Sequence, residues 1–137
     1  MKFLIFSLLL LSDLFAGTAA EYAATLNAQT DLNKAYTQAK NEKKDMILLL
    51  IVKEGCHWCD KMVKLTLQDN TVKYALSDTV IVVTDLHSEL AKRYNATLTP
   101  TMVFIDAKTK KSVYQQVGYE KAGAFMITIV SAVDNLP

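Results

Sequence analysis

The chain has 137 residues, of which 51% are hydrophobic, and this is enough for one globular domain with a substantial core. Its 15 basic and 14 acidic residues leave a net charge of +1. They form no basic stripe and no acidic tail, so the composition favours neither nucleic acid nor an acidic substrate as a partner.

The first 20 residues have the layout of a secretory signal peptide. Lys2 precedes an apolar core at residues 3–11, and small residues follow at 16–20. This apolar core is shorter than the roughly 20 residues that a membrane-spanning helix needs. An uncleaved anchor and a buried first helix are the alternatives. We expect export, cleavage after Ala19 or Ala20, and a folded domain over residues 21–137.

Helical and strand patterns alternate after this leader. The expected helices cover residues 31–41, 56–68, 70–77, 88–95 and 120–134, the first capped by Thr30 or Asp31. The expected strands cover residues 46–52, 79–85, 102–105 and 112–117. This order predicts an α/β fold in which a central mixed sheet is flanked by helices. The sheet is expected to be parallel, with an antiparallel edge added by the last hairpin.

Two of these elements carry specific expectations about the core. The run at residues 46–52 is apolar without interruption, which is typical of a central strand covered on both faces. The last helix has one apolar stripe that we expect to face the core: Ala122, Phe125, Met126, Ile129, Val130 and Val133.

The only two cysteines of the chain lie in the sequence Cys56-His57-Trp58-Cys59, between an expected strand and an expected helix. A Cys-x-x-Cys pair in this position is typical of a thiol–disulfide redox site. A purely structural disulfide is the alternative in an exported protein. Because the stabilisation by a disulfide grows with the length of the loop it closes, so short a loop would gain little. We therefore favour a redox role.

The position of each motif residue on the expected helix suggests its role. Cys56 lies at the helix N-terminus, where the helix dipole and free backbone N–H groups lower the pKa of a thiol, so we expect it to be the attacking nucleophile. Cys59 lies one turn further along and is expected to resolve the mixed disulfide. His57 would tune the pair by charge or hydrogen bonding, unless it is merely solvated. Trp58 would shield the disulfide or contact a substrate protein.

The residues after the leader resemble the thioredoxin superfamily over most of their length. The landmarks arrive in the order of that family: an apolar strand, the Cys-x-x-Cys motif, Thr99-Pro100-Thr101, a strand hairpin, Gly118 and an amphipathic helix. Exported SoxW-type proteins and the C-terminal domain of DsbD are relatives of this kind. The resemblance implies that Pro100 is cis and faces the disulfide, a trans turn proline being the alternative. It also implies that the Thr99 backbone pairs with an extended substrate and that the Thr99 hydroxyl lies near Cys56.

Two positions depart from the family pattern. Leu50 stands where cytoplasmic thioredoxins carry a buried Asp that accepts the proton of the resolving thiol, and Gly55 replaces the Trp that precedes their first cysteine. Proton transfer from Cys59 therefore needs another acceptor, for which Glu54, Lys53 and water are the candidates.

The resemblance implies an exported, periplasmic thiol–disulfide oxidoreductase without a cofactor, which exchanges disulfides with protein substrates that carry thiols or disulfides. Small exported relatives without insertions act mostly as reductases. We therefore expect a monomeric reductase that receives electrons from a membrane donor such as a DsbD-like protein. A disulfide-donating oxidase is the alternative, and His57 argues mildly for it.

A metal-binding or metal-delivery protein is an alternative from a different class. Cys56 and Cys59 can bind zinc or copper(I), with His57 or His87 as a further ligand. Zinc prefers four ligands, and His57 is poorly placed between the cysteines to complete a tetrahedron with both, so we expect no metal site. A non-catalytic binding module is a third alternative, against which the intact cysteine pair argues.

Overall fold

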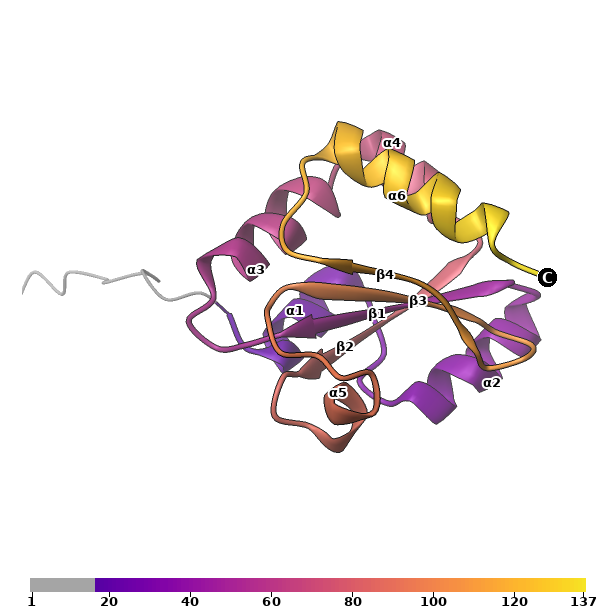
Figure 1. Ribbon diagram of the computed structural model, residues 1–137, viewed down its shortest axis with the longest axis horizontal. Coiled ribbons are helices and arrows are strands. Elements are labelled where there is room, and N and C mark those ends of the chain that lie inside the picture. Colours follow the sequence, from indigo (N-terminus) through magenta and orange to yellow (C-terminus); the bar gives the residue numbers. More distant parts are fainter. Residues whose placement is uncertain (1–16) are drawn as a thin grey trace, which may run out of the picture.

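The computed structural model describes residues 17–137, in which helices pack on both faces of a central sheet (Figure 1). The helices are α1 (Ala19–Leu26), α2 (Leu32–Glu42), α3 (His57–Lys61), α4 (Asn70–Ala75), α5 (Glu89–Arg93) and α6 (Ala122–Asp134). A π-helical turn, η1 (Met62–Thr66), continues α3. The strands are β1 (Met46–Val52), β2 (Thr79–Asp85), β3 (Thr101–Asp106) and β4 (Ser112–Val117). Residues 1–16 lie outside the described residues, so the signal peptide and its cleavage site stay predictions.

Four strands form one mixed sheet in the order β2-β1-β3-β4. Strand β1 is parallel to β2 and antiparallel to β3, and β3 is antiparallel to β4. All four strands lie within one residue of the bounds expected from the sequence. The expected α/β fold, with a mixed sheet flanked by helices, is therefore confirmed.

The direction of β3 was predicted wrongly. A sheet that is parallel up to its last hairpin would have β3 parallel to β1, yet the two strands are antiparallel. A parallel connection has to return along a strand of 7 residues, about 23 Å, whereas the 5-residue helix α5 spans about 7.5 Å. Because α5 is too short to run back along the sheet, β3 starts at the end where β2 finishes.

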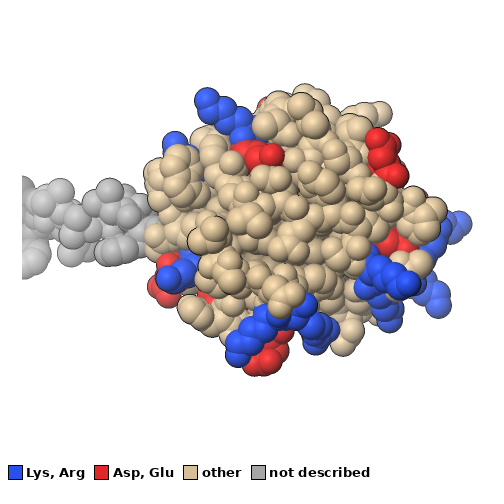
Figure 2. Space-filling model, in the orientation of Figure 1, with Lys and Arg blue, Asp and Glu red and all other residues tan. Residues whose placement is uncertain are grey.

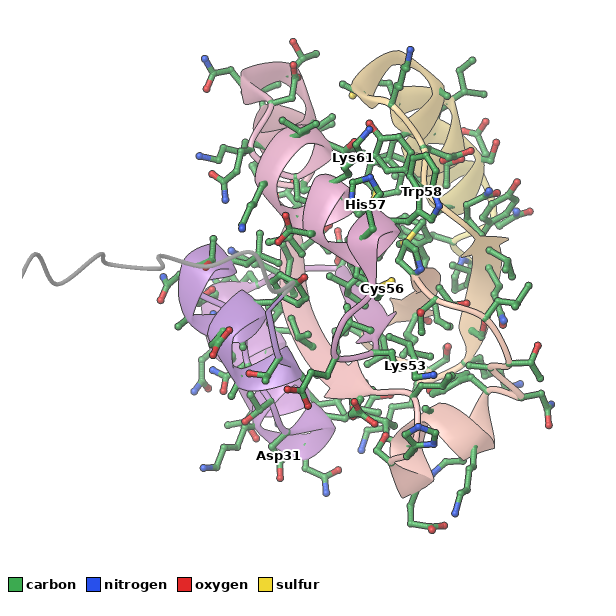
Figure 3. The ribbon with its side chains drawn as sticks, turned by 90° about the vertical axis from the view of Figure 1, so that its left-hand side faces the viewer. Asp31, Lys53, Cys56, His57, Trp58 and Lys61 are labelled. Atoms are coloured by element: carbon green, nitrogen blue, oxygen red, sulfur yellow. A yellow bond between two sulfur atoms is a disulfide. The ribbon has the colours of Figure 1, made fainter. Side chains whose placement is uncertain are left out.

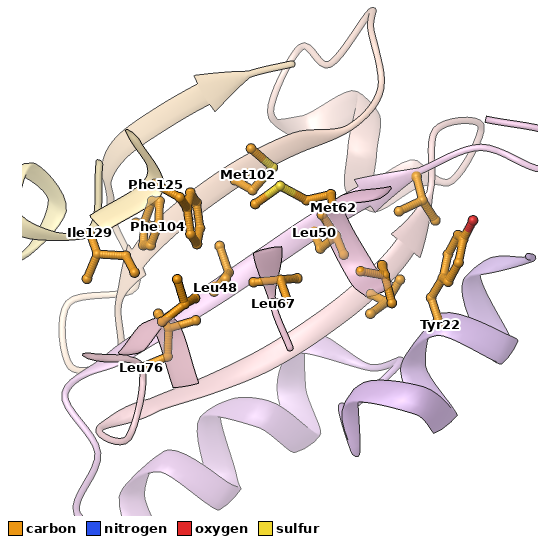
Figure 4. Close-up of a cluster of buried hydrophobic side chains, with 14 of the residues drawn as sticks. Tyr22, Leu48, Leu50, Met62, Leu67, Leu76, Met102, Phe104, Phe125 and Ile129 are labelled. Atoms are coloured by element: carbon orange, nitrogen blue, oxygen red, sulfur yellow. The ribbon is translucent and has the colours of Figure 1, made fainter. Parts of the chain in front are cut away.

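Strand β1 is the centre of the core, because all 7 of its residues are buried, as expected for a strand covered on both faces. Successive side chains of a strand point to opposite faces. Leu48 and Leu50 therefore join a cluster with residues of α1, α3, η1, α4 and α6, part of which Figure 4 shows. Ile47 and Leu49 join a second cluster, with residues of α2 and α5.

Side-chain caps fix where α2 and α5 begin. Of the two caps expected for α2, Asp31 is the one that acts, since its Oδ1 accepts a hydrogen bond from the backbone N–H of Lys34 at 2.9 Å. The Ser88 hydroxyl oxygen accepts from the N–H of Ala91 at 3.0 Å in the same way. Both helices thus begin within one residue of the predicted start.

Helix α1 was not predicted, because its N-terminal cap overlaps the expected cleavage site. Thr18 and Glu21 form a capping box, in which the side chain of each residue accepts a hydrogen bond from the backbone N–H of the other. This Thr-x-x-Glu pattern is the sequence signal from which the start of α1 could have been predicted. The helix buries Tyr22 and Ala23 in the core. None of the helices within residues 17–137 has both the length and the apolar character needed to cross a membrane.

The buried face of α6 is rotated from the expected stripe. Val130 and Val133 were expected to face the core, but they are 55% and 48% exposed, whereas Thr128 and Ala132 are buried. Phe125 is buried as expected, with its ring centroid 6.1 Å from that of Phe104 on β3. Because the helix is apolar around most of its circumference, its sequence pattern does not single out one face.

Two neighbouring residues of α6 give a test of this face. Ile129 is 2% exposed and Val130 is 55% exposed. We expect Ile129→Ala to lower the free energy of unfolding by about 2–4 kcal/mol, because it removes buried methyl groups and leaves a cavity. Val130→Ala is the matched control and should cost about 0.5 kcal/mol or less. Urea denaturation followed by circular dichroism measures both variants, and equal losses would contradict the assigned face.

Candidate redox site

The cysteine pair lies where the central strand ends. Strand β1 finishes at Val52, an exposed turn follows, and Cys56 caps the N-terminus of α3 (Figure 3). Gly55 in this turn has a φ of +74°, a conformation that residues with a Cβ rarely adopt. A disulfide joins Cys56 to Cys59, and their Cα atoms are 5.2 Å apart. The motif therefore spans the junction between the strand and the helix.

The two sulfur atoms differ in their surroundings. Cys59 is fully buried, whereas Cys56 is partly exposed. Cys56 Sγ accepts two hydrogen bonds, one from the backbone N–H of Cys59 at 3.1 Å and one from the Thr99 hydroxyl at 3.3 Å. A sulfur atom that approaches from solvent would therefore reach Cys56 first, and the same two donors would stabilise a thiolate there.

Thr99 and Pro100 reach the disulfide from a segment 43 residues away in the sequence. The peptide bond between them is cis, and Pro100 is buried. Strand β3 begins directly after Pro100, whose carbonyl accepts a hydrogen bond from the N–H of Gly118 at 2.8 Å. The Thr101 hydroxyl donates to the Leu98 carbonyl at 2.7 Å, so within the Thr-Pro-Thr triplet it is Thr99 that bonds to sulfur.

Trp58 belongs to a small group of side chains that the sequence did not reveal. The indole is 50% exposed and stacks on Tyr119, with ring centroids 5.3 Å apart and planes at 25°. The Lys61 ammonium lies 5.0 Å from the ring centre, and His57 meets the indole edge-on at 5.3 Å. These contacts hold a half-exposed aromatic surface beside the disulfide. No sequence pattern marked Tyr119, because it follows β4 and lies far from the motif along the chain.

The surroundings of Cys59 are apolar. It belongs to the buried cluster that contains Leu50 and Met62. Leu50, which replaces the buried Asp of cytoplasmic thioredoxins, is therefore part of the core around Cys59. Lys53 and Glu54, the two side chains named as proton acceptors, are exposed in the turn before Cys56. The acceptors named from the sequence thus lie on the solvent side of the disulfide.

One polar contact ties α1 to the redox helix. The Tyr22 hydroxyl donates to Asp60 Oδ1 at 3.3 Å and accepts from the backbone N–H of Gly17 at 3.0 Å. Burial raises the pKa of Tyr22 to about 12, so this hydroxyl stays protonated and able to donate. Asp60 Oδ1 also pairs with Lys64 at 2.8 Å. Asp60, which directly follows Cys59 in the sequence, is therefore held by both Tyr22 and Lys64.

The metal-binding alternative needs a third and a fourth ligand beside the cysteines. His87 lies in an exposed turn after β2, and its backbone N–H donates to Asp85 Oδ1 at 2.8 Å. Within residues 17–137, no group of three or more His, Cys, Asp or Glu side chains is placed to hold a metal ion. In this structure, the Cys56–Cys59 disulfide uses both sulfur atoms that the metal-binding alternative needs as ligands.

The sequence of this chain matches a known protein family and a curated relative. The model of the Thioredoxin-like domain family matches residues 32–130. A curated relative, the thiol:disulfide interchange protein DsbD of Ralstonia nicotianae, is 28% identical over 93 residues. That match covers 64% of this chain and 15% of DsbD, so the chain spans only a small part of the length of this relative.

Solved structures show the same fold at low identity. A thioredoxin from Thermus thermophilus is 23% identical, with a TM-score of 0.67 over 77% of this chain and 86% of that chain. The DsbH oxidoreductase is 24% identical, with a TM-score of 0.62 over 77% and 83%. A thioredoxin-fold protein from Helicobacter pylori is 18% identical, with a TM-score of 0.65 over 86% and 85%. Because the family model covers most of the sequence and the fold agrees with it, this chain belongs to the Thioredoxin-like domain family, within the thioredoxin superfamily.

Proposed function

We propose that this chain is an exported thiol–disulfide oxidoreductase that reduces disulfides in protein substrates. The observation that carries the proposal is the asymmetric disulfide at the N-terminus of α3, in which Cys56 is accessible and Cys59 is buried. Membership of the Thioredoxin-like domain family and the similarity to a thiol:disulfide interchange protein support this reaction class. The closer resemblance to SoxW-type proteins stays a prediction.

The proposed reaction moves two electrons from the cysteine pair to the substrate. In the reduced enzyme, the Cys56 thiolate attacks one sulfur of the substrate disulfide, and the other substrate sulfur leaves as a thiolate and takes up a proton. Cys59 then loses its proton and attacks Cys56 Sγ. This step forms the Cys56–Cys59 bond, breaks the mixed disulfide and releases the second substrate thiol. The substrate is then reduced and the enzyme is oxidised.

Exposed apolar side chains next to the disulfide would hold the substrate. Trp58 is 50% exposed, Leu98 is 63% exposed and Val117 is 47% exposed. Leu98 precedes Thr99 in the chain, and Val117 pairs with Thr101 in the sheet, so both lie beside the Thr-Pro-Thr segment. We expect the Thr99 backbone to pair with an extended substrate segment along this surface, as the family resemblance implies.

Export and the direction of electron flow rest on the sequence. The leader supports secretion to the periplasm, where a membrane donor such as a DsbD-like protein would return electrons to the cysteine pair. An oxidase that donates its disulfide is the second candidate. It is favoured by His57, which directly follows Cys56, since a cationic imidazole there would stabilise the reduced thiolate and make the disulfide more oxidising.

The reduction potential of the Cys56–Cys59 pair tests the proposal and separates its two directions. Equilibration against thiol buffers, followed by trapping of the thiols, should give a value near −270 mV, that is, about that of thioredoxin, for a reductase that depends on a donor. A value near about −120 mV would instead mean an oxidant. If no disulfide forms between the two cysteines in any buffer, the redox proposal fails.

Cys59→Ser should stop the reaction halfway, because the mixed disulfide on Cys56 then has no resolving thiol. We expect adducts between this variant and proteins of a native extract, seen on gels as bands that a reducing agent removes. The matched control is Cys56→Ser combined with Cys59→Ser, which should form none. A clean absence of adducts with the single variant would count against protein substrates.

Thr99→Val removes the hydroxyl that donates to Cys56 Sγ and keeps the shape of the side chain. Loss of this donor to the thiolate should raise the pKa of the Cys56 thiol and slow its alkylation at about pH 6 roughly three- to tenfold. Thr97→Val, two residues earlier at an exposed position, is the control and should behave as wild type. The rate of reaction with iodoacetamide against pH measures both, and an unchanged profile for Thr99→Val would contradict this role.

A further inference from the structure

A hollow with a volume of about 710 Å³ lies at the opposite end of the sheet from the disulfide. It is formed where α2 ends, β1 begins and the chain turns from β3 to β4, whereas Cys56 follows the other end of β1. One aromatic ring and five lysines line it: Tyr36, Lys40, Lys43, Lys44, Lys108 and Lys110. We call it the lysine hollow.

The lysines of this hollow come from two segments that are far apart in the sequence. Three belong to the end of α2 and the residues that follow it, and two belong to the turn between β3 and β4. Figure 2 shows Lys and Arg side chains, with some acidic ones, at the right-hand edge of the molecule, where Figure 1 has this turn. Neither segment forms a basic stripe by itself, so the cluster could not be recognised from the sequence.

Carboxylates neutralise only part of this charge. Lys108 pairs with Asp45, which also lines the hollow, at 3.3 Å, and Lys44 pairs with Glu42 at 3.3 Å. The other three lysines form no ion pair within residues 17–137: Lys40, Lys43 and Lys110. Three ammonium groups around one hollow repel one another, so an anion bound between them would lower the electrostatic energy of the site.

The backbone gives a second, independent observation. Lys43 has a φ of +56° and Lys110 has a φ of +62°, in the left-handed region that usually holds Gly or Asn. Among residues 17–137, the other non-glycine residues with positive φ are Asn27 and Asn95, which tolerate it. Both lysines at such positions line the same hollow. Lys43 is the left-handed C-cap that ends α2, a position that Gly fills most easily, so the turn itself does not require a lysine there.

Tyr36 holds one of these lysines in place. The Lys110 ammonium lies 4.9 Å from the centre of the partly buried Tyr36 ring. A cation held over an aromatic face has less freedom than one on a solvated side chain, so it loses less entropy when a ligand binds. The hollow therefore combines the size of a small-molecule site, several lysines and one cation held in place by an aromatic ring.

We propose that the lysine hollow binds a small anion that carries clustered phosphate groups. Its volume falls within the range of about 300–1,000 Å³ that is typical of small-molecule sites. Lysine binds phosphate as a compact point charge, and three unpaired ammonium groups match the multiple charges of a diphosphate. The phosphate groups would come from a free phosphorylated molecule or from a lipid headgroup. This binding site is separate from the redox site and does not depend on the proposed reductase activity.

Pyrophosphate is the probe for this site, titrated by calorimetry at low ionic strength into the oxidised full-length chain. Lys43→Gly combined with Lys110→Gly removes two ammonium groups and suits the left-handed backbone. We expect this variant to bind pyrophosphate at least about tenfold more weakly. Because Gly relieves the backbone at both positions, Tm should rise by roughly 3 °C or more. If the two lysines had only a structural role, the variant would not combine weaker pyrophosphate binding with a higher Tm.

The charge-matched control is Lys34→Gln combined with Lys73→Gln, at exposed positions of α2 and α4 outside the hollow. It should bind pyrophosphate within about twofold of wild type, because screening weakens distant charges. Sedimentation with phosphatidylglycerol vesicles, compared with phosphatidylcholine vesicles, identifies the source of the phosphate. Binding to the anionic vesicles that the glycine variant loses would assign a lipid headgroup, and pyrophosphate binding without vesicle binding would assign a free molecule. Equal weakening in both double variants, or no binding of either probe, would overturn the proposal.

Discussion

The structure depends on one strand that is buried along its whole length. Strand β1 has 7 buried residues and lies between β2 and β3 in the sheet. Burial of each large aliphatic side chain contributes on the order of 1.5–3 kcal/mol. Asp45 and Lys53 flank the run, so a shift of β1 along its axis would bury a charge. The end of the strand is therefore fixed, and with it the point where Cys56 starts α3.

The direction of β3 brings the second part of the site to that point. Because β3 is antiparallel to β1, its first residue, Thr101, pairs with Ile51 near the end of β1. The two residues before β3 are then next to the motif, and the Thr99 hydroxyl lies 3.3 Å from Cys56 Sγ. A parallel β3 would begin at the other end of the sheet, about 20 Å away. The feature that the sequence predicted wrongly is thus the one that completes the site.

The sequence predicted what depends on local pattern and missed what depends on packing between distant segments. The apolar run of β1 and the Cys-x-x-Cys motif are local, and both were found at the predicted positions. The buried face of α6 depends on its neighbours in space, and Val130 was misplaced for that reason. The stacking of Trp58 on Tyr119 joins segments far apart in the chain, and so does the hollow that both Lys43 and Lys110 line. No periodicity or short motif encodes such contacts.

The two cysteines share one helix but not one environment, and the roles proposed for them rest on this difference. Hydrogen-bond donors and the helix N-terminus favour a thiolate at Cys56, whereas burial among apolar side chains disfavours one at Cys59. In the proposed reaction, Cys59 would therefore keep its proton until the mixed disulfide has formed. Since Leu50 cannot accept that proton, it has to leave toward the solvent side, past the turn before Cys56. A protein substrate bound to Cys56 as proposed would cover this side, so the surface of the substrate would influence how fast the reduced substrate is released.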